Sequence, residues 1–284
     1  MIGGRTGVFN VAGEGIMLVG AVVGFLGAYL SGSLWIGILL AVLIGGLFGL
    51  VMAYFTTTLK MDQFVIGLAL FIFGLGLATL LYKLVIGVTL KPPLIARLED
   101  VPIPLLSQIP ILGEALFSQN LIFYFTVVIA VILQVVLYRT RVGREIRSVG
   151  ENPMAADSLG VNVFANCYAT AIIGGMLMGI AGAYLPMAYT STFTEGIVGG
   201  RGWVSIALTF FGFWRPIPIL LGSLFFAAVE VVSFRAQVVA IGIPYQFLTM
   251  IPYIATILVM MAFYGRAKTP AFLGRNYDRE KRGI

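Results

Sequence analysis

The stretch GREIRSVGENPMAADSLG, residues 143–160, decides the fold of this chain because it is a polar island between two apolar segments. Each flanking segment, near 119–139 and 166–190, has the roughly 20 mostly apolar residues that a membrane-spanning helix needs. A membrane protein keeps a polar segment of this kind in water. Arginines beside it indicate the cytoplasmic side, where Lys and Arg are enriched. They are Arg139, Arg141, Arg144 and Arg147.

A short helix is predicted inside this island. Proline is favoured at the first position of a helix, and Asn152 before Pro153 is a good N-cap residue. Glu151 adds negative charge at the end of the helix dipole that favours it. A short helix held between two spans suits docking onto a soluble partner, whereas the charge alone favours an ordinary basic loop.

The composition indicates a membrane protein. Of the 284 residues, 60% are hydrophobic and 11% are charged, and the mean hydropathy is +1.01. A soluble domain carries roughly 25% charged residues, so most of this chain must face lipid or other buried helices. One cysteine, Cys167, and no histidine exclude disulfides, thiolate metal clusters and imidazole catalysis. We expect no catalytic residue, no metal site and no enzyme activity in this membrane protein, and the net charge of +6 does not require a nucleic-acid partner, because basic cytoplasmic loops account for it.

About eight apolar segments are candidates to cross the membrane. They lie near residues 8–30, 34–57, 62–86, 119–139, 166–190, 198–214, 216–236 and 245–264. The sixth is short and begins in a Gly-rich turn, which suggests a re-entrant or broken helix. The proline-rich loop 87–118 is not expected to span, and could lie on the membrane surface as short amphipathic pieces. The predicted fold class is an all-α, polytopic transmembrane helix bundle.

The distribution of Lys and Arg orients this bundle. With the N-terminus inside, Arg5, Lys60, Arg215 and a basic tail fall on the cytoplasmic side. The basic residues of the tail are Arg266, Lys268, Arg275, Arg279, Lys281 and Arg282. We predict a multi-pass protein of the plasma (inner) membrane, with a membrane domain over 1–264, a cytoplasmic loop over 140–165 and a cytoplasmic tail over 265–284. No cleavable signal peptide is expected, because Arg5 leads directly into a long apolar run.

The source of energy for any uphill transport has to lie outside this chain or in an ion gradient. The sequence contains no G-x-x-x-x-G-K-[ST] motif, and no cytoplasmic segment is long enough for a nucleotide-binding domain. We expect this chain to bind no cofactor.

Small and polar residues inside the apolar runs indicate a helix bundle with a path through it. The pairs Gly20/Gly24, Gly45/Gly49 and Gly175/Gly179 have the spacing that lets helix backbones approach closely, which serves packing alone or a path. Ionisable groups within spans are costly and usually face an interior or a partner. The polar and charged residues that interrupt the runs are Asn10, Glu14, Glu195, Arg201, Glu230 and Arg235.

Each of these charges has a structural alternative. Glu14 either complements the dipole of its own helix or acts in the path. Arg201 either lines a vestibule or extends to the outer headgroups. Glu230 and Arg235 are expected to reach interfacial water or to bond to one another's neighbours. The segments 199–202 and Ile243–Pro244 break helical continuity, as transporter helices do near a pathway.

Four motifs, in order along the chain, resemble the permease subunits of the branched-chain amino acid/ribose importer superfamily of ABC transporters. Gly7–Ala21 resembles the N-[IL]-x-x-E-G-x-M-L-x-G-A signature, and Arg147–Pro153 with Ala155, Ala156 and Gly160 resembles the R-x-V-G-E-N-P-x-A-A loop. Gly200–Trp203 followed by Gly212, Trp214 and Pro216 resembles G-R-G-[FW]…G-x-W-x-P. The remaining similarity comprises Glu230, Arg235 and Gln237, then Ile243–Phe247 and Pro252–Tyr253. The E-G-x-M-L and I-P-Y-Q-F forms are most similar to the simple-sugar and nucleoside branch.

The resemblance implies an importer that works by alternating access. The cytoplasmic loop would couple the helices to a cytosolic ABC ATPase subunit that uses ATP, through Arg144, Arg147, Gly150, Glu151, Asn152, Pro153, Ala155, Ala156 and Gly160. The substrate path would include Asn10, Glu14, Arg201, Trp203 and Gln246. The other implied partners are a second, paralogous permease subunit and an extracytoplasmic substrate-binding protein, all within or against the lipid bilayer. Family members carry another span ahead of the Asn-x-x-x-Glu-Gly part of the first motif, whereas here only nine residues precede Asn10, so we expect either an upstream start or a missing helix.

The function that we predict from the sequence is uptake of a small polar solute, a nucleoside or simple sugar. One alternative is a branched-chain amino acid permease of the same class. The others are an ion-coupled secondary transporter that uses Glu14 or Glu230 as its proton site, and a scaffold that does not transport.

Overall fold

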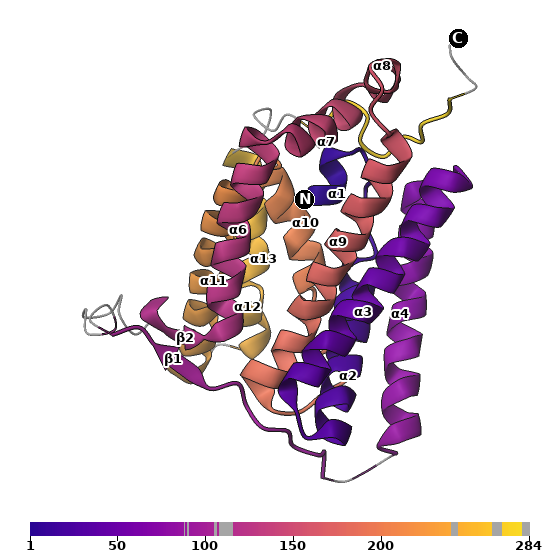
Figure 1. The fold of residues 1–284 in the computed structure, drawn as a ribbon. Helices are drawn as coiled ribbons and strands as arrows, with labels where there is room; N and C mark the ends of the chain where they lie inside the picture. The colour runs from indigo at the N-terminus through magenta and orange to yellow at the C-terminus, as the bar shows by residue number, and fades with distance from the viewer. Residues whose placement is uncertain are drawn as a thin grey trace.

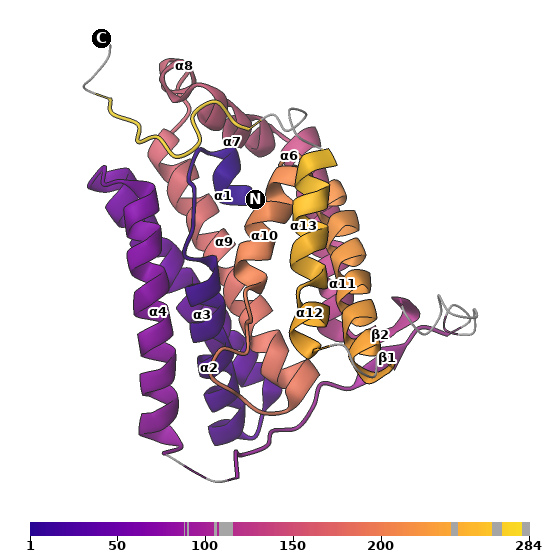
Figure 2. The same cartoon turned by 180° about the vertical axis from the view of Figure 1, so that it is seen from behind.

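The computed structural model describes residues 1–87, 89, 91–104, 107, 116–239, 244–262 and 269–279. The chain runs back and forth between two ends, which we call the α7–α8 end and the β1–β2 end after the elements that lie there (Figures 1 and 2). The elements are α1 (Ile2–Arg5), α2 (Gly13–Ser31), α3 (Leu34–Ala53), η1 (Tyr54–Thr58), α4 (Gln63–Val85), β1 (Asp100–Pro102), β2 (Ser118–Asn120), α6 (Leu121–Arg139), α7 (Arg141–Glu151), α8 (Pro153–Ser158), α9 (Val163–Tyr184), η3 (Leu185–Thr190), α10 (Arg201–Phe211), α11 (Pro216–Val239), α12 (Tyr245–Thr249) and α13 (Ile251–Ala262).

Within the described residues, six helices are long and apolar enough to cross a membrane, so the prediction of about eight spans is not confirmed. These helices are Gly13–Ser31, Leu34–Thr58, Gln63–Val85, Leu121–Arg139, Val163–Thr190 and Pro216–Gln237. They show a multi-pass helical bundle. The two remaining predicted segments, 198–214 and 245–264, form shorter helices.

The segment 198–214 is short because its glycines interrupt the helix. Gly199 and Gly200 have φ values of 57° and 82°, a left-handed conformation that glycine adopts without steric cost. The helix that follows, α10, has 11 residues. At 1.5 Å per residue it is about 16 Å long, roughly half the thickness of the hydrocarbon core. The chain therefore enters the bundle in a non-helical conformation and becomes helical inside it.

The last predicted segment is divided into α12 and α13. Pro252, the second residue of α13, has no backbone N–H to continue a helix from α12. Ile243 of the predicted break, and residues 263–264, lie outside the described residues.

The first predicted segment, 8–30, is helical only from Gly13. Gly7 has a φ of 89°, and the Oδ1 atom of Asn10 accepts a hydrogen bond from the backbone N–H of Ala12 at 2.9 Å. Such a local side-chain bond competes with a helix, so residues 6–12 connect α1 to α2 in a non-helical conformation. The sequence prediction placed the start of this helix too early.

The packing centre of the bundle is the contact of α2 and α3 with α9, where glycines replace larger side chains. A Cβ atom on Gly45 would overlap the carbonyl oxygen of Gly175, and one on Gly20 would lie 2.5 Å from the carbonyl oxygen of Gly179. The predicted close approach of helices at these glycines is confirmed, and its role here is packing. In contrast, α4, α6 and α11 carry many exposed apolar side chains, among them Phe73 and Leu221, as lipid-facing helices do.

An extended segment runs along the β1–β2 end of the bundle. In its described part, the backbone N–H of Ile95 donates to the carbonyl of Ser191 at 3.0 Å, and that of Leu98 donates to Met187 at 2.9 Å. β1 pairs with β2 in antiparallel fashion, with Val101 opposite Gln119. These backbone bonds hold residues 91–104 in a largely extended conformation, and the described part of loop 87–118 contains no helix long enough to span a membrane. Residues 88, 90, 105–106 and 108–115 lie outside the described residues.

Candidate functional site

The predicted polar island forms two short helices, α7 and α8, that lie across one end of the bundle (Figure 1). Both begin with a side-chain cap. Thr140 Oγ1 accepts from the N–H of Gly143 at 3.2 Å, and Asn152 Oδ1 accepts from the N–H of Ala155 at 3.0 Å. The second helix begins at Pro153 with Asn152 as its cap, as the sequence predicts.

The predicted docking residues divide between two faces of this helix pair. Gly150, Pro153 and Ala156 are buried against the bundle, and Arg147 is half-buried. The other predicted residues are exposed on the opposite side: Arg144, Glu151, Asn152, Ala155 and Gly160. Met154 and Leu159 are also exposed, at 41% and 85%. The pair thus presents charged groups and large apolar side chains outward, which a soluble partner can contact.

The inner face of α7 is anchored to α1 and α6. A Cβ atom on Gly150 would overlap the carbonyl oxygen of Arg5, so only glycine permits this approach. Tyr138 at the end of α6 has three guanidinium groups near its ring, with centroid distances of 5.0 Å for Arg147, 5.9 Å for Arg5 and 5.7 Å for Arg215. An aromatic face attracts cations at such distances. Tyr138 therefore connects α7 to α1 and to the start of α11.

Arg5 extends this contact to the turn between α10 and α11. It donates to the carbonyls of Phe213 and Trp214, both at 2.9 Å, and to the hydroxyl of Tyr138 at 2.8 Å. Phe213 and Trp214 have φ values of 52° and 58°, which is strained for large side chains. Burial lowers the pKa of Arg5, while Tyr138 and Glu151 raise it, and an arginine stays protonated under such influences. The guanidinium thus stabilises a strained turn.

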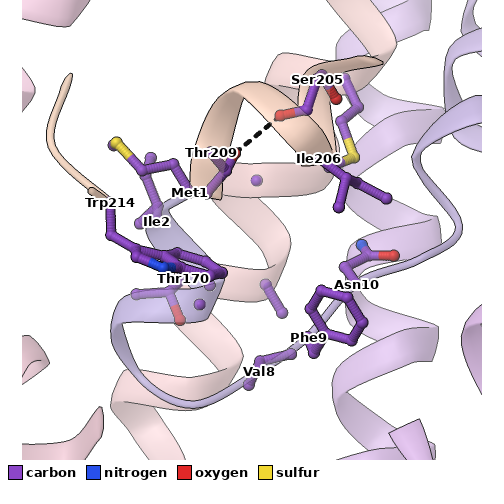
Figure 3. A pocket seen from close by; sticks show the side chains of 15 residues that line it. Met1, Ile2, Val8, Phe9, Asn10, Thr170, Ser205, Ile206, Thr209 and Trp214 are labelled. Carbon is purple, nitrogen blue, oxygen red and sulfur yellow. Dashed lines mark hydrogen bonds between the residues drawn. The ribbon is translucent and has the colours of Figure 1, made fainter. Parts of the chain in front are cut away.

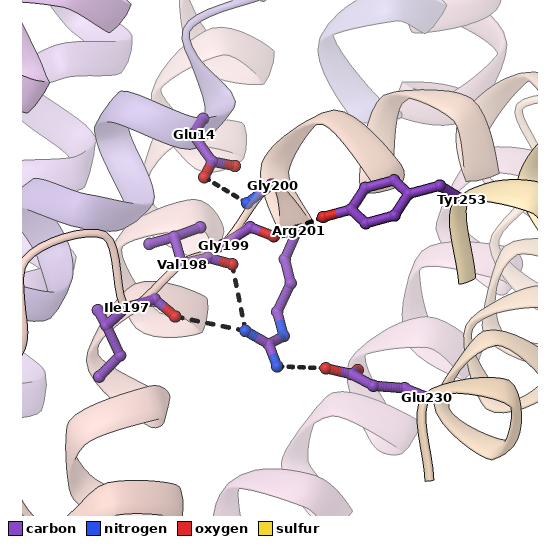
Figure 4. A network of polar contacts seen from close by, with 8 residues as sticks. All are labelled: Glu14, Ile197, Val198, Gly199, Gly200, Arg201, Glu230 and Tyr253. Carbon is purple, nitrogen blue, oxygen red and sulfur yellow. Dashed lines mark hydrogen bonds and ion pairs between the residues drawn. The ribbon is translucent and has the colours of Figure 1, made fainter. Parts of the chain in front are cut away.

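A second group of polar contacts surrounds the break before α10 (Figure 4). Glu14, in the first turn of α2, is 9% exposed. Its Oε1 accepts from the N–H of Gly200 at 2.8 Å, and its Oε2 accepts from the N–H of Gly202 at 2.7 Å. A carboxylate at this position satisfies two unpaired donors and complements the dipole of α10. Glu14 is therefore the cap of a helix other than its own.

The same break is also held by Arg201 of α10, by its ion-pair partner Glu230 of α11 and by Tyr253 of α13. The guanidinium of Arg201 donates to the carbonyls of Ile197 and Val198 at 3.3 and 3.2 Å, and it forms an ion pair with Glu230 on α11. The hydroxyl of Tyr253 donates to the carbonyl of Gly199 at 3.2 Å. The break is held by side chains from separate helices, so its conformation depends on their relative positions.

The remaining predicted path residues are not brought into this group. Trp203 is 41% exposed on α10, with its ring at 5.6 Å, edge to face, from that of Phe71. Gln246 is exposed on α12, which packs against α11 and α13. Asn10 lines a separate cavity of about 60 Å³ between α1, α9 and α10 (Figure 3), together with Thr170, Ser205, Thr209 and Trp214. The five predicted residues therefore occupy four places, since only Glu14 and Arg201 lie together at the break.

These features define a polytopic helical membrane protein, with apolar spans, a broken helix inside the bundle and a pair of short capped helices at one end. The chain belongs to the family described as the permease component of branched-chain amino acid transport systems, whose family model matches residues 1–264. Members of this family are membrane transport proteins and not enzymes.

Curated relatives agree with this assignment. The nucleoside ABC transporter permease protein NupC of Lactococcus lactis is 37% identical, and the guanosine ABC transporter permease protein NupQ of Bacillus subtilis is 34% identical; each match covers 98% of this chain and 90% of the relative. The putative glucose ABC transporter permease protein TsgC13 of Haloferax volcanii is 30% identical, over 99% of this chain and 92% of the relative. No solved structure matches the chain.

The contact partners of Glu230 and Arg147 were not predicted from the sequence. Glu230 was expected to reach interfacial water or to bond to a neighbour of Arg235, and its particular partner, Arg201, lies 29 residues away in the sequence. Tyr138, which lies nine residues before Arg147 and across a helix boundary, was not selected. For Arg201 and Glu230, the available signal was a charge of each sign within apolar runs. For Tyr138 and Arg147, the sequence contains no such signal.

Proposed function

We propose that this chain is a permease subunit of an ATP-driven importer for nucleosides or related simple sugars. Three relatives that match nearly the whole chain have names that specify a nucleoside, guanosine and glucose. The chain itself binds no cofactor in this proposal, and a separate ATPase subunit uses the ATP.

The α7–α8 helix pair is the observation that carries the proposal. A subunit without its own nucleotide-binding domain needs a surface that receives movement from an ATPase. The pair offers exposed Met154 and Leu159 toward a partner, while Gly150 and Ala156 are buried against the bundle. A partner that binds this surface would push directly on α1 and α9.

The same end of the bundle faces the cytoplasm in this proposal. Its arginines and lysine on described residues are Arg5, Lys60, Arg139, Arg141, Arg144, Arg147, Arg215, Arg275 and Arg279. Such an excess of basic residues favours the cytoplasmic side. The C-terminus is then cytoplasmic, and the β1–β2 end faces an extracytoplasmic substrate-binding protein.

The solute path is formed with a second permease subunit, a paralogue of this chain. The cavity beside Asn10, of about 60 Å³, is far smaller than the roughly 300–1,000 Å³ of small-molecule pockets. A path between two subunits does not need a large cavity within either subunit. The exposed apolar faces of α4, α6 and α11 leave ample surface for both lipid and such a partner.

A neutral, hydroxyl-rich solute fits the charges in the bundle. Glu14 is occupied by two backbone donors, and Arg201 and Glu230 pair with each other. A charged solute would need an intramembrane charge to compensate its own. The cap geometry of Glu14 likewise favours a structural role over that of a proton site in a secondary transporter.

The proposal is tested in the complex reconstituted with its ATPase, second permease and binding protein. Gly150→Glu and Pro153→Leu displace the inner face of the helix pair, and we expect ATP hydrolysis to continue while nucleoside uptake falls sharply. Wild-type uptake from both variants would contradict the docking assignment. Uptake by the wild type without ATPase subunits, driven by a proton gradient, would favour a secondary transporter.

A further inference from the structure

Residues 269–279 form a segment that we call the tail clasp. It follows α13 in the sequence and crosses the α7–α8 end, passing between the helix pair and the end of α4 (Figures 1 and 2). The sequence predicts a basic cytoplasmic tail here, and in the structure Pro270 is buried and Tyr277 is only 8% exposed. The ring of Tyr277 packs 6.2 Å from that of Phe164 on α9, so the clasp is part of the hydrophobic core at this end.

The clasp first contacts α7 and the N-terminal segment through backbone hydrogen bonds. The N–H of Phe272 donates to the carbonyl of Gly150 at 2.9 Å, and the N–H of Gly274 donates to the carbonyl of Gly7 at 2.9 Å. A Cβ atom on Gly7 would lie 3.0 Å from the carbonyl oxygen of Phe272. These contacts hold the clasp against α7 on one side and against the N-terminal segment, at Gly7, on the other.

The clasp next contacts the connection between η1 and α4. The side-chain amide of Gln63, a residue only 4% exposed, donates to the carbonyl of Arg275 at 3.2 Å and to Asn276 Oδ1 at 3.1 Å. In return, Asn276 Nδ2 donates to the carbonyl of Met61 at 2.7 Å. An exposed ion pair between Lys60 and Asp278, at 2.7 Å, adds to this attachment.

The clasp finally binds α8 through one carboxylate. Oδ2 of Asp157 accepts from the hydroxyl of Tyr277 at 2.9 Å and from Nε of Arg279 at 3.1 Å. The Asp157 side chain is 12% exposed and that of Arg279 is 66% exposed, so the bond to the buried Tyr277 is the better shielded of the two. Charge-assisted hydrogen bonds of this kind are stronger than neutral ones.

The position of α8 must depend on such contacts because the helix has only six residues. A helix of this length does not persist on its own hydrogen bonds. We propose that the tail clasp ties α8 to α4 and to the N-terminal segment, so that movement of the docking helix is passed to these elements. Asp157 and Tyr277 are the positioning residues. This inference rests on the proposed function, since it concerns how the ATPase moves the permease.

The decisive experiment uses the complete reconstituted importer with Tyr277→Phe, which removes the hydroxyl and keeps the buried ring. We expect normal membrane insertion and normal co-purification of the ATPase, with a fall of about threefold to tenfold in solute moved per ATP hydrolysed. Asp157→Ala loses both hydrogen bonds and should lower this ratio further. The matched control is Tyr54→Phe at the same end, because Tyr54 is 48% exposed and its hydroxyl has no hydrogen bond to the described residues.

A second measurement stands apart from transport. Hydrogen exchange of α8 amides in the assembled complex should be faster in Tyr277→Phe than in the wild type or in Tyr54→Phe. Unchanged exchange, or an unchanged ratio of uptake to hydrolysis in Tyr277→Phe, would overturn the clasp as a tie. Loss of ATPase binding in Tyr277→Phe would also overturn it, because the tail would then be part of the docking surface. Absence of ATP-driven uptake by the wild type would instead contradict the proposed function, and exchange would still decide the role of the clasp.

Discussion

Replacement of Glu14 tests whether a side chain from α2 holds the start of α10. In Glu14→Ala, the N–H groups of Gly200 and Gly202 lose acceptors at 2.8 and 2.7 Å in a place that is 9% exposed. A hydrogen bond to a charged group contributes about 1.5–3 kcal/mol, so the loss of both should cost about 3–6 kcal/mol. Glu14→Gln keeps one carbonyl acceptor and turns an NH₂ group toward the other donor, which should cost about half as much.

The assay is thermal unfolding of the purified permease in lipid nanodiscs, together with ATP-driven uptake between about pH 6 and 8. We expect the unfolding temperature to fall in the order wild type, Glu14→Gln, Glu14→Ala. Uptake by Glu14→Gln should fall only in part, with the pH dependence of the wild type. Glu195→Gln serves as a control, because Glu195 forms an exposed ion pair with Lys83 that contributes little to stability. An unfolding temperature of Glu14→Ala equal to that of the wild type would refute the capping role. Complete loss of uptake in a fully stable Glu14→Gln, with proton-driven uptake by the wild type, would make Glu14 a proton site.

Two further substitutions test the packing seam and the break. Gly45→Ala places a methyl group against the carbonyl of Gly175 and should lower stability by about 1–3 kcal/mol, measured as the unfolding temperature. Gly76→Ala on α4 meets nothing within 4 Å and should leave stability unchanged or raise it; equal effects of the two would contradict the close contact of α3 and α9. Arg201→Lys cannot reproduce the fork that joins two carbonyls and Glu230, so uptake should fall by about tenfold or more while Arg235→Lys has little effect. Normal uptake by Arg201→Lys would show that charge alone is needed at that position.

Helix ends were the least predictable part of the fold. The start of α8 could be read from Asn152 and Pro153, because an N-cap and a proline act within a few residues. The start of α2 at Gly13 could not, since the apolar run continues through residues 8–12. The helix does not begin earlier because the side chain of Asn10 accepts a local hydrogen bond and Gly7 has a positive φ. In addition, the N–H of Phe9 donates to the side chain of Gln63, 54 residues away.

The sequence by itself determined that this is a polytopic helical membrane protein, the family to which it belongs, and the polar segment in which α8 begins. These depend on composition and on short motifs, which are properties of neighbouring residues. Only the tertiary structure decided what each buried polar group does: Glu14 caps α10, Arg201 pairs with Glu230, and Tyr277 binds Asp157. The physical reason is that a buried charge or donor must find a partner, and in a bundle that partner comes from whichever helix packs beside it. Helix packing is set by the glycine surfaces of α2, α3 and α9 acting together, so no single segment contains the information.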